Sequence, residues 1–349
     1  MTKVPAYAAA GPTEPLSPFT IDRRDPGPND VVIDILFCGI CHSDIHQVRN
    51  EWQSSMYPMV PGHEIVGRVV EVGRDVVKVQ PGALAGVGCY VDSCLACGHC
   101  RDNLEQFCEK GAAFTYNGTE MDRKTPTFGG YSTRIVVRDH FVLRVPETLD
   151  PAGAAPLMCA GITTFSPLHE WKTKKGDRVA VVGLGGLGHM AVKLARSLGA
   201  EVTVLSTSRA KEADARRLGA TEFEVTKEKG TFERLRGRFD LILDTVSAVH
   251  DYNEYLRTLR PLGTMVLLGI PPAPIPLDAA ALILGNRRLV GSNIGGIAET
   301  QAMLDYCGKH GIVSDVEVIG VQEINAAYER VLRGDVRYRA VIDVATLTR

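Results

Sequence analysis

The sequence predicts an α/β protein of two domains, one rich in β-strands and one built on a doubly wound parallel sheet. First, 349 residues are more than one hydrophobic core usually organises. Second, β-branched runs such as 31–37 and 65–72 alternate with Pro-Gly turns in the first 150 or so residues. Third, short apolar strands alternate with helices after about residue 160, which is typical of a parallel sheet covered on both faces.

The expected elements of the second domain follow one another in a regular alternation. Strands are predicted at 179–182, 202–205, 223–225, 241–243, 264–268 and 288–292, the last at the sheet edge. Helices are predicted at 187–198, 210–218, 231–236 and 253–259. A tail with helices at 299–309 and 325–332 and strands at 317–319 and 340–344 is expected to return to the first domain. The predicted domains are therefore 1–160 with 293–349, and 161–292.

Composition and charge exclude several classes of function. Charged residues make up 23% of the chain and the formal net charge is −2, so no basic face is available for a nucleic acid. No run of roughly 20 apolar residues could span a bilayer, and the N-terminal residues lack the apolar core of a secretory signal. We expect a cytoplasmic protein that acts on a small molecule, with neither a nucleic-acid nor a membrane partner.

A glycine turn predicts a dinucleotide site. The run Gly183-Leu184-Gly185-Gly186-Leu187-Gly188 lies between an apolar strand and an Ala/Leu-rich helix. In such a turn the first glycine permits the bend, the second lets the backbone approach a pyrophosphate, and the third allows close helix packing. Glycine loops also end strands for structural reasons, but here strand, helix and repeating units all stand where the motif needs them. The second domain is therefore predicted to be a Rossmann domain.

The end of the next strand indicates which cofactor binds. An NAD site usually carries an acidic residue there, to bind the ribose 2′-hydroxyl. This chain instead has Ser206, Thr207, Ser208 and Arg209, followed by Lys211. Hydroxyls and cations can hydrogen-bond and neutralise a 2′-phosphate, which favours NADP over NAD. In the alternative interpretation, the two cations are solvated helix charges and cofactor choice is relaxed.

Four clustered cysteines predict a structural metal site in a lobe at about 89–110. The chain has nine cysteines, and an odd number argues against a simple disulfide framework. Cys94, Cys97, Cys100 and Cys108 could close a tetrahedral zinc site with no open position. An iron–sulfur cluster is less consistent, because the bacterial pattern has a different last spacing and a following proline. Unligated or disulfide-bonded cysteines are the remaining alternative.

Three dispersed residues could form a second zinc site. Cys41, His63 and Cys159 each have an ordinary explanation alone, and Cys159 in particular could be a small buried apolar residue. Together they would make a Cys₂His set with a fourth position open, as a catalytic zinc requires.

These motifs resemble those of the medium-chain zinc-dependent alcohol dehydrogenases, and most closely the cinnamyl alcohol dehydrogenase branch. The matching segments are 39–46, 57–64, the four-cysteine lobe, 128–131, 156–164, 183–188 and 335–339. They extend over nearly the whole chain. The resemblance implies a GroES-like β-rich catalytic domain interrupted by the Rossmann domain, with two zinc ions per chain. It also implies a homodimer formed through the sheet-edge segment 287–292, with a tetramer as the alternative.

The resemblance also implies roles for the residues around the catalytic zinc. Cys41, His63 and Cys159 would bind the metal, Glu64 would approach it during ligand exchange, and Asp44 would orient the histidine.

A proton relay and further cofactor contacts are implied as well. Ser43 would contact the substrate oxygen and His46 would pass the proton onward through the cofactor ribose. Thr163, Ser292 and Arg339 would contact the cofactor, with Arg339 at the pyrophosphate. The alternatives are a turn hydroxyl for Ser43, a surface histidine for His46, and a solvated charge for Arg339.

The implied reaction is reversible hydride transfer between NADP(H) and primary alcohols or aldehydes, aromatic or of medium chain length. Phe114 is expected to line the substrate pocket, although it could equally belong to the core. Because NADPH pools are generally kept reduced, aldehyde reduction is the expected direction. A polyol or secondary-alcohol dehydrogenase is an alternative, but polyol enzymes often carry acidic residues in place of Cys159 and Ser206. A more remote alternative is a zinc protein that binds NADPH but does not catalyse a reaction.

Overall fold

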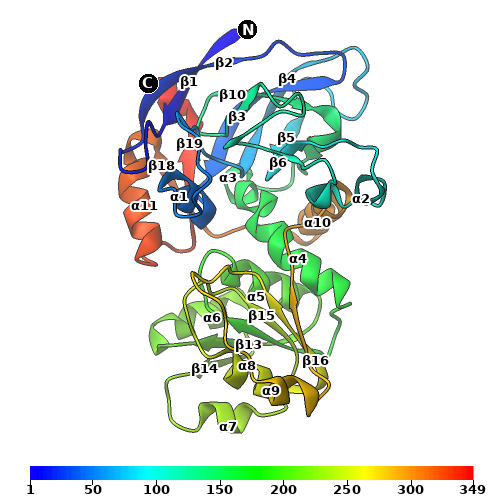
Figure 1. Ribbon diagram of the computed structural model, residues 1–349, viewed down its shortest axis with the longest axis vertical. Helices are drawn as coiled ribbons and strands as arrows, with labels where there is room; N and C mark the ends of the chain where they lie inside the picture. Colours follow the sequence, from blue (N-terminus) through cyan, green and yellow to red (C-terminus); the bar gives the residue numbers. More distant parts are fainter. Residues whose placement is uncertain (349) are drawn as a thin grey trace. The chain divides into compact units, whose positions relative to one another are not determined.

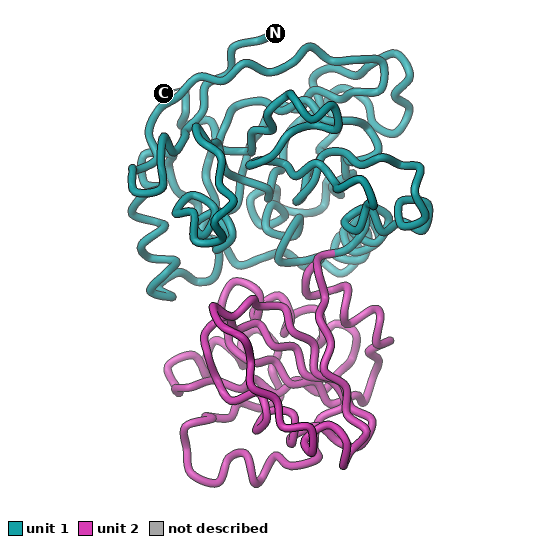
Figure 2. The backbone as a smooth tube through the Cα atoms, in the orientation of Figure 1, with its two compact units in different colours: residues 1–162, 295–349 teal, residues 163–294 magenta. Residues whose placement is uncertain are grey.

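The chain forms two compact units in the computed structural model, which describes residues 1–348 (Figures 1 and 2). Unit 1 contains Met1–Ile162 and the chain from Gly295 onward, and unit 2 contains Thr163–Ile294. These divisions fall two residues from the boundaries expected from the sequence. Within the described part of the chain, no helix is both long and apolar enough to cross a membrane.

Unit 2 is a six-stranded, wholly parallel sheet in the order β14-β13-β12-β15-β16-β17. Its strands are β12 (Arg178–Val182), β13 (Glu201–Ser206), β14 (Glu222–Val225), β15 (Phe239–Asp244), β16 (Leu259–Leu267) and β17 (Arg288–Gly291). The chain starts at β12, builds two strands on one side, and then returns to build three on the other. The predicted doubly wound fold is confirmed, and its ligand crevice is expected where the strand order reverses, beside β12.

The helices of unit 2 connect these strands. They are α4 (Ala160–Glu170, which begins in unit 1), α5 (Gly188–Ser197), α6 (Glu212–Leu218), α7 (Thr231–Leu235), α8 (Tyr252–Thr258) and α9 (Ala279–Ile283). The expected helix 210–218 is wrong at its start, where a 3₁₀ turn (Arg209–Lys211) precedes α6. Strand β16 begins five residues before its predicted start, because Leu259 pairs with Phe239 ahead of a register shift.

Unit 1 is built around a mixed sheet in the order β11-β5-β4-β3-β19-β18, with β10 also paired to β3. The strands are β3 (Asp30–Gly39), β4 (Ile65–Val72), β5 (Leu84–Val87), β10 (Arg134–Arg138), β11 (Leu143–Arg144), β18 (Val316–Gly320) and β19 (Arg339–Asp343). Figure 1 shows β19, in red, beside β3, in blue, and Val341 pairs with Gly39. The tail therefore returns to the first domain, as predicted.

Smaller elements complete unit 1. Three short two-stranded sheets join β1 (Thr2–Ala8) to β2 (Ser17–Arg23), β6 (Tyr90–Asp92) to β7 (Ala113–Phe114), and β8 (Gly118–Thr119) to β9 (Pro126–Thr127). The helices are α1 (His42–Val48), α2 (Gly98–Arg101), α3 (Pro151–Ala154), α10 (Ile297–His310) and α11 (Ile324–Leu332).

Candidate active site and metal centres

Four buried side chains of unit 1 converge on one point. The ligand atoms of Cys41, His63, Glu64 and Cys159 all lie within 4.8 Å of one another. Cys41 stands between β3 and α1, His63 and Glu64 directly precede β4, and Cys159 follows a short 3₁₀ turn (Ala155–Met158). Two thiols, an imidazole and a carboxylate are a donor set that suits zinc. The structure thus brings together the three dispersed residues that the sequence proposed as ligands.

Two glycines make this approach possible. A Cβ on Gly39 would lie 2.0 Å from the Glu64 carboxylate oxygen Oε2, and the backbone N–H of Gly39 donates to the Glu64 carbonyl at 2.9 Å. Gly62 has a φ of +105°, and a Cβ there would lie 2.7 Å from the ring of Tyr131. A larger residue at Gly39 would collide with Glu64, and one at Gly62 would collide with Cys38 and Tyr131, so either would displace the His63–Glu64 segment.

Asp44 fixes the orientation of the histidine. Its Oδ1 atom lies 3.0 Å from Nδ1 of His63, which leaves the other ring nitrogen, Nε2, for a metal. The carboxylate also accepts the backbone N–H groups of Cys41 at 2.8 Å and Gly62 at 3.2 Å, and Asp44 is fully buried. Burial alone would lower the pKa of His63, but the adjacent Asp44 carboxylate holds it well above the usual value. This contact between Asp44 and His63 is the one that the role implied for Asp44 requires.

Glu64 and Arg339 form a buried ion pair beside the same cluster. The Arg339 guanidinium donates to Oε1 of Glu64, and only 5% of Arg339 is exposed, so its interpretation as a solvated charge is wrong. Burial outweighs the arginine and raises the pKa of Glu64 to about 7. Among the described residues, Oε2 of Glu64 and Nε of Arg339 have no hydrogen-bond partner. A carboxylate oxygen without a partner next to metal donors is available to approach a bound ion.

The pKa values of the two ligand thiols are shifted in opposite directions. Hydrogen bonds to Cys41 and Cys89, together with burial, raise the pKa of Cys159 well above its usual value. A hydrogen bond from Cys159, together with the nearby His63, outweighs burial and holds the pKa of Cys41 well below its usual value. A thiolate is the form that binds zinc. The thiol of Cys89 also interacts with Cys159, although the sequence does not indicate a role for Cys89. Cys89 precedes the regular spacing of the four-cysteine cluster, and its closeness to Cys159 arises only from the fold.

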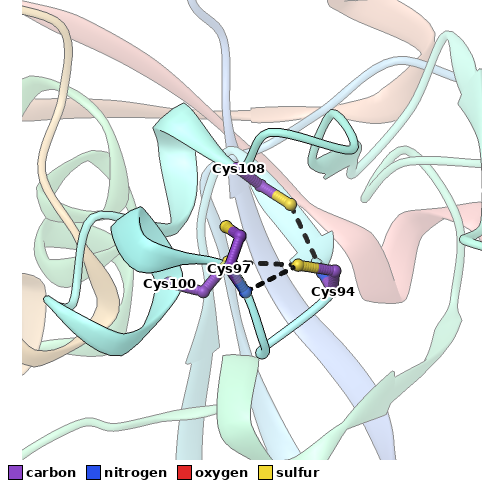
Figure 3. Close-up of side chains that lie close together, drawn as sticks. All are labelled: Cys94, Cys97, Cys100 and Cys108. Carbon is purple, nitrogen blue, oxygen red and sulfur yellow. Dashed lines mark hydrogen bonds between the residues drawn. The ribbon is translucent and has the colours of Figure 1, made fainter.

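The four-cysteine lobe forms a second, separate cluster in unit 1. The sulfur atoms of Cys94, Cys97, Cys100 and Cys108 all lie within 4.8 Å of one another, around α2 (Figure 3). Backbone N–H groups point at these sulfurs: Cys97 donates to Cys94 at 3.3 Å and Cys94 donates to Cys108 at 3.4 Å. Such bonds, foremost that from Ala96, lower the pKa of Cys94 to about 6. All nine cysteines are free, so the disulfide alternative is wrong.

In unit 2 the glycine turn connects β12 to α5. Gly183 has a φ of +85°, a Cβ on Gly185 would meet no atom within 4 Å, and a Cβ on Gly188 would lie 2.2 Å from the Gly183 carbonyl oxygen. These are the three properties that a dinucleotide turn needs: a bend, an open backbone and a tight helix contact. Gly186 and Leu187 complete the turn into α5. The ammonium group of Lys211 donates to the Leu184 carbonyl at 2.8 Å, which places it at this turn.

Ser206 ends β13, and Thr207, Ser208 and Arg209 are exposed after it. Arg209 forms ion pairs with Glu228 at 2.8 Å and with Glu212 at 3.2 Å, which the sequence did not suggest. Of the other expected cofactor contacts in unit 2, Thr163 is buried in α4 and Ser292 is half-buried just beyond β17.

The expected proton relay occupies α1. Ser43 and His46 are three residues apart, so they share one side of the helix. Nδ1 of His46 lies 2.5 Å from a Glu51 carboxylate oxygen, and its ring centroid is 5.2 Å from that of Trp52. Phe114, on β7, is 58% exposed, so the alternative that it belongs to the core is wrong.

Comparison with known proteins agrees with this geometry. Residues 27–147 match the alcohol dehydrogenase GroES-like domain, and residues 186–309 match the zinc-binding dehydrogenase family. An NADP-dependent alcohol dehydrogenase C of Mycobacterium tuberculosis is 56% identical over 347 residues, covering 99% of this chain and 100% of that protein. The chain belongs to the zinc-dependent alcohol dehydrogenases. The predicted family is confirmed, as is the combination of GroES-like and Rossmann domains.

Two further relatives describe the branch to which this dehydrogenase is similar. An aldehyde reductase of Escherichia coli is 51% identical over 348 residues, covering 99% of both chains. A cinnamyl alcohol dehydrogenase structure from Sorghum bicolor superposes with a TM-score of 0.96 at 44% identity, covering 99% of this chain and 98% of that one.

Proposed function

We propose that this dehydrogenase catalyses reversible hydride transfer between NADP(H) and primary alcohols or aldehydes at the Cys41–His63–Cys159 site. The observation that supports this best is the buried convergence of these three donors, within 4.8 Å of one another and of Glu64. Two thiolates and one imidazole leave a fourth position for a substrate oxygen. Zinc bound there supplies a Lewis acid that polarises the carbon–oxygen bond of the substrate.

The residues around the three donors prepare the site. Asp44 holds the His63 ring so that Nε2 faces the thiols, and the same carboxylate anchors the Cys41 backbone. Glu64 adds a negative charge that Arg339 balances, and burial keeps bulk water away from all of them. In our proposal Arg339 also reaches the cofactor pyrophosphate, while the four-cysteine lobe binds a second, structural zinc.

The proton follows a separate route in this proposal. The Ser43 hydroxyl would accept the proton of the substrate alcohol while releasing its own, and His46 would pass that released proton on to solvent. The Glu51 carboxylate beside Nδ1 of His46 can stabilise the protonated ring. In aldehyde reduction, the proposed physiological direction, the proton moves the opposite way.

The cofactor is proposed to lie on the glycine turn of unit 2. The open backbone at Gly185 admits the pyrophosphate, and the hydroxyls of 206–208 with Arg209 and Lys211 bind the 2′-phosphate. Thr163 and Ser292 are proposed to make further contacts. The names of the Mycobacterium and Escherichia relatives support NADP as the cofactor and aldehydes as substrates. We propose that Phe114 lines a pocket for aromatic or medium-chain substrates, and that the protein is cytoplasmic.

A cofactor and substrate panel tests the proposal. Following absorbance at 340 nm, we expect rapid oxidation of NADPH, and much slower oxidation of NADH, with benzaldehyde, cinnamaldehyde and hexanal. Metal analysis should give two zinc ions per chain. Turnover of mannitol but not of aldehydes would instead favour a polyol dehydrogenase, and one zinc without turnover would favour a non-catalytic protein. If alcohol oxidation were the faster reaction at cellular cofactor ratios, the proposed direction would be wrong.

We also propose a homodimer formed through the edge strand β17. Two exposed apolar residues, Ile283 and Leu284, follow one another just before that strand, and Leu284 is 85% exposed. An edge strand with free backbone groups and apolar neighbours is a natural surface for a second copy.

Leu284→Asp should therefore convert the dimer to a monomer, because it would place a charge in the apolar interface. Light scattering coupled to gel filtration would measure the change. Val77→Asp is the matched control, since Val77 is 86% exposed in unit 1. If Leu284→Asp stayed dimeric, the proposed interface would be wrong.

A further inference from the structure

The buried Asp44 carboxylate has more hydrogen-bond donors than its histidine alone. Oδ1 accepts from His63 Nδ1 at 3.0 Å and from the Gly62 backbone at 3.2 Å. Oδ2 accepts from the Cys41 backbone at 2.8 Å and from the Tyr131 hydroxyl, whose oxygen is 3.5 Å away. These four bonds give each carboxylate oxygen two donors, and the bond from Tyr131 comes from outside the two ligand-bearing segments.

A second tyrosine continues this arrangement. The Tyr328 hydroxyl on α11 donates to the Tyr131 hydroxyl, with 3.3 Å between the oxygens. Tyr131 is fully buried and Tyr328 is 4% exposed, so neither hydroxyl has ready access to water. A buried hydroxyl without a partner is costly, and the chain Tyr328–Tyr131–Asp44 satisfies both. The bond from Tyr328 orients the Tyr131 hydrogen toward Asp44, because it occupies a lone pair of the Tyr131 oxygen.

The positions of these residues suggest what the hydrogen-bonded series Tyr328–Tyr131–Asp44 does. A carboxylate turns about its last side-chain bond at little cost, because that torsion has a broad preference. Donors on both oxygens limit this rotation. With Oδ2 held by Cys41 and Tyr131, Oδ1 stays in line with Nδ1 of His63, and the ring stays turned toward the thiols. Tyr116 adds to this support, since its ring stacks on that of His63 with centroids 5.8 Å apart and its hydroxyl also interacts with Asp44.

We infer that Tyr131, oriented by Tyr328, is a positioning residue for the catalytic zinc: it fixes the Asp44 carboxylate, which fixes the His63 ligand. This inference rests on the proposed zinc site. It assigns to a tyrosine outside the ligand set, and to the C-terminal helix α11, a share in retaining the metal. Substitutions of the carboxylate that holds a zinc-bound histidine typically weaken metal affinity about 10- to 100-fold. Tyr131 acts through that carboxylate, so the loss expected here is at the lower end, about tenfold.

Zinc release from the holoenzyme tests the inference. Purified protein is mixed with an excess of the chelator EDTA, and loss of each zinc is timed by quenching samples, desalting them and measuring residual metal. Each zinc should give its own phase of release. The phase that belongs to the catalytic zinc is the one that is missing when Cys159→Ala protein is measured. We expect Tyr131→Phe to release the catalytic zinc about tenfold faster while the structural zinc leaves at the wild-type rate. Tyr328→Phe should have a smaller effect, and the double variant should lose zinc no faster than Tyr131→Phe.

Tyr252→Phe is the matched control. Tyr252 is buried in unit 2, and its hydroxyl has no hydrogen-bond partner among the described residues, so release of both zincs should be unchanged. If Tyr131→Phe released the catalytic zinc at the wild-type rate, this inference would be wrong, but the proposed active site would be unaffected. Equal acceleration of both phases would also overturn the inference, since that is the signature of a general loosening of unit 1. A wild-type protein holding one zinc would overturn the proposed active site and this inference with it.

Discussion

Cys159→Ala is expected to lower kcat/KM for aldehyde reduction at least about a thousandfold and to reduce the zinc content from two ions per chain to one. The Lewis acid is worth several kcal/mol in the transition state, and each 1.4 kcal/mol is tenfold in rate. Cys159 reaches the Cys41–His63 pair from a separate segment, so its loss leaves only two of the three donors. Metal analysis and the absorbance assay together measure the outcome.

The matched control for this experiment is Cys307→Ala. Cys307 is also a free, buried thiol of unit 1, but it lies on α10 against Met303 and outside both clusters. We expect it to keep both zincs and most of its activity. Cys159→Ala with two zincs, or with activity within tenfold of wild type, would contradict the proposed ligand set. Equal losses in both variants would point to misfolding, which thermal unfolding would reveal.

Ser206→Asp is expected to reverse the cofactor preference. Ser206 ends β13 and is half-buried, so a carboxylate there would face the 2′-phosphate of NADP in the proposed site. Placing like charges opposite each other costs several kcal/mol, so kcat/KM for NADPH should fall on the order of 100-fold or more. The reaction with NADH should change little or improve, because a carboxylate can accept the ribose 2′-hydroxyl.

Ser206→Asn separates charge from size in this experiment. Asparagine has nearly the shape of aspartate without its charge, so it should lose much less of the NADPH activity. Steady-state kinetics with both cofactors at saturating aldehyde would measure each ratio. If Asn and Asp lowered NADPH activity equally, shape rather than charge would decide the preference. If neither variant changed the ratio, the 2′-phosphate would bind elsewhere.

Much of the fold could be predicted because its signals are local. The alternation of short apolar strands with helices appears directly in the sequence, and β12, β13, β15 and β17 lie close to their expected ranges. The errors occur where tertiary contacts override local preference. A helix was expected from 210, but Lys211 has a φ of −109° and donates to the Leu184 carbonyl, so α6 begins only at Glu212.

The site was predictable to the extent that its residues lie in short, recognisable motifs. The proposed ligands are of this kind. Their partners differ in this respect. Asp44 lies in the same motif as Cys41, whereas the pairing of Arg339 with Glu64, 275 positions away, leaves no trace in local spacing. For the same reason, nothing in the segment 128–131 indicates a role for Tyr131. Arg209 was expected to be solvated or phosphate-binding, and its pairing with Glu228 depends on how two loops of unit 2 meet.

The pairing of β19 with β3 also determines when the site can be finished during synthesis. Cys41, His63 and Glu64 are made early, whereas Arg339, at the start of β19, is made 275 residues after Glu64. Chains are made at roughly 5–20 residues per second, so Arg339 is added on the order of tens of seconds after Glu64. Unit 2 is complete in the meantime, since Thr163–Ile294 is continuous. We therefore expect the nucleotide-binding half to mature first, and the metal to be captured permanently only after β19 has been made.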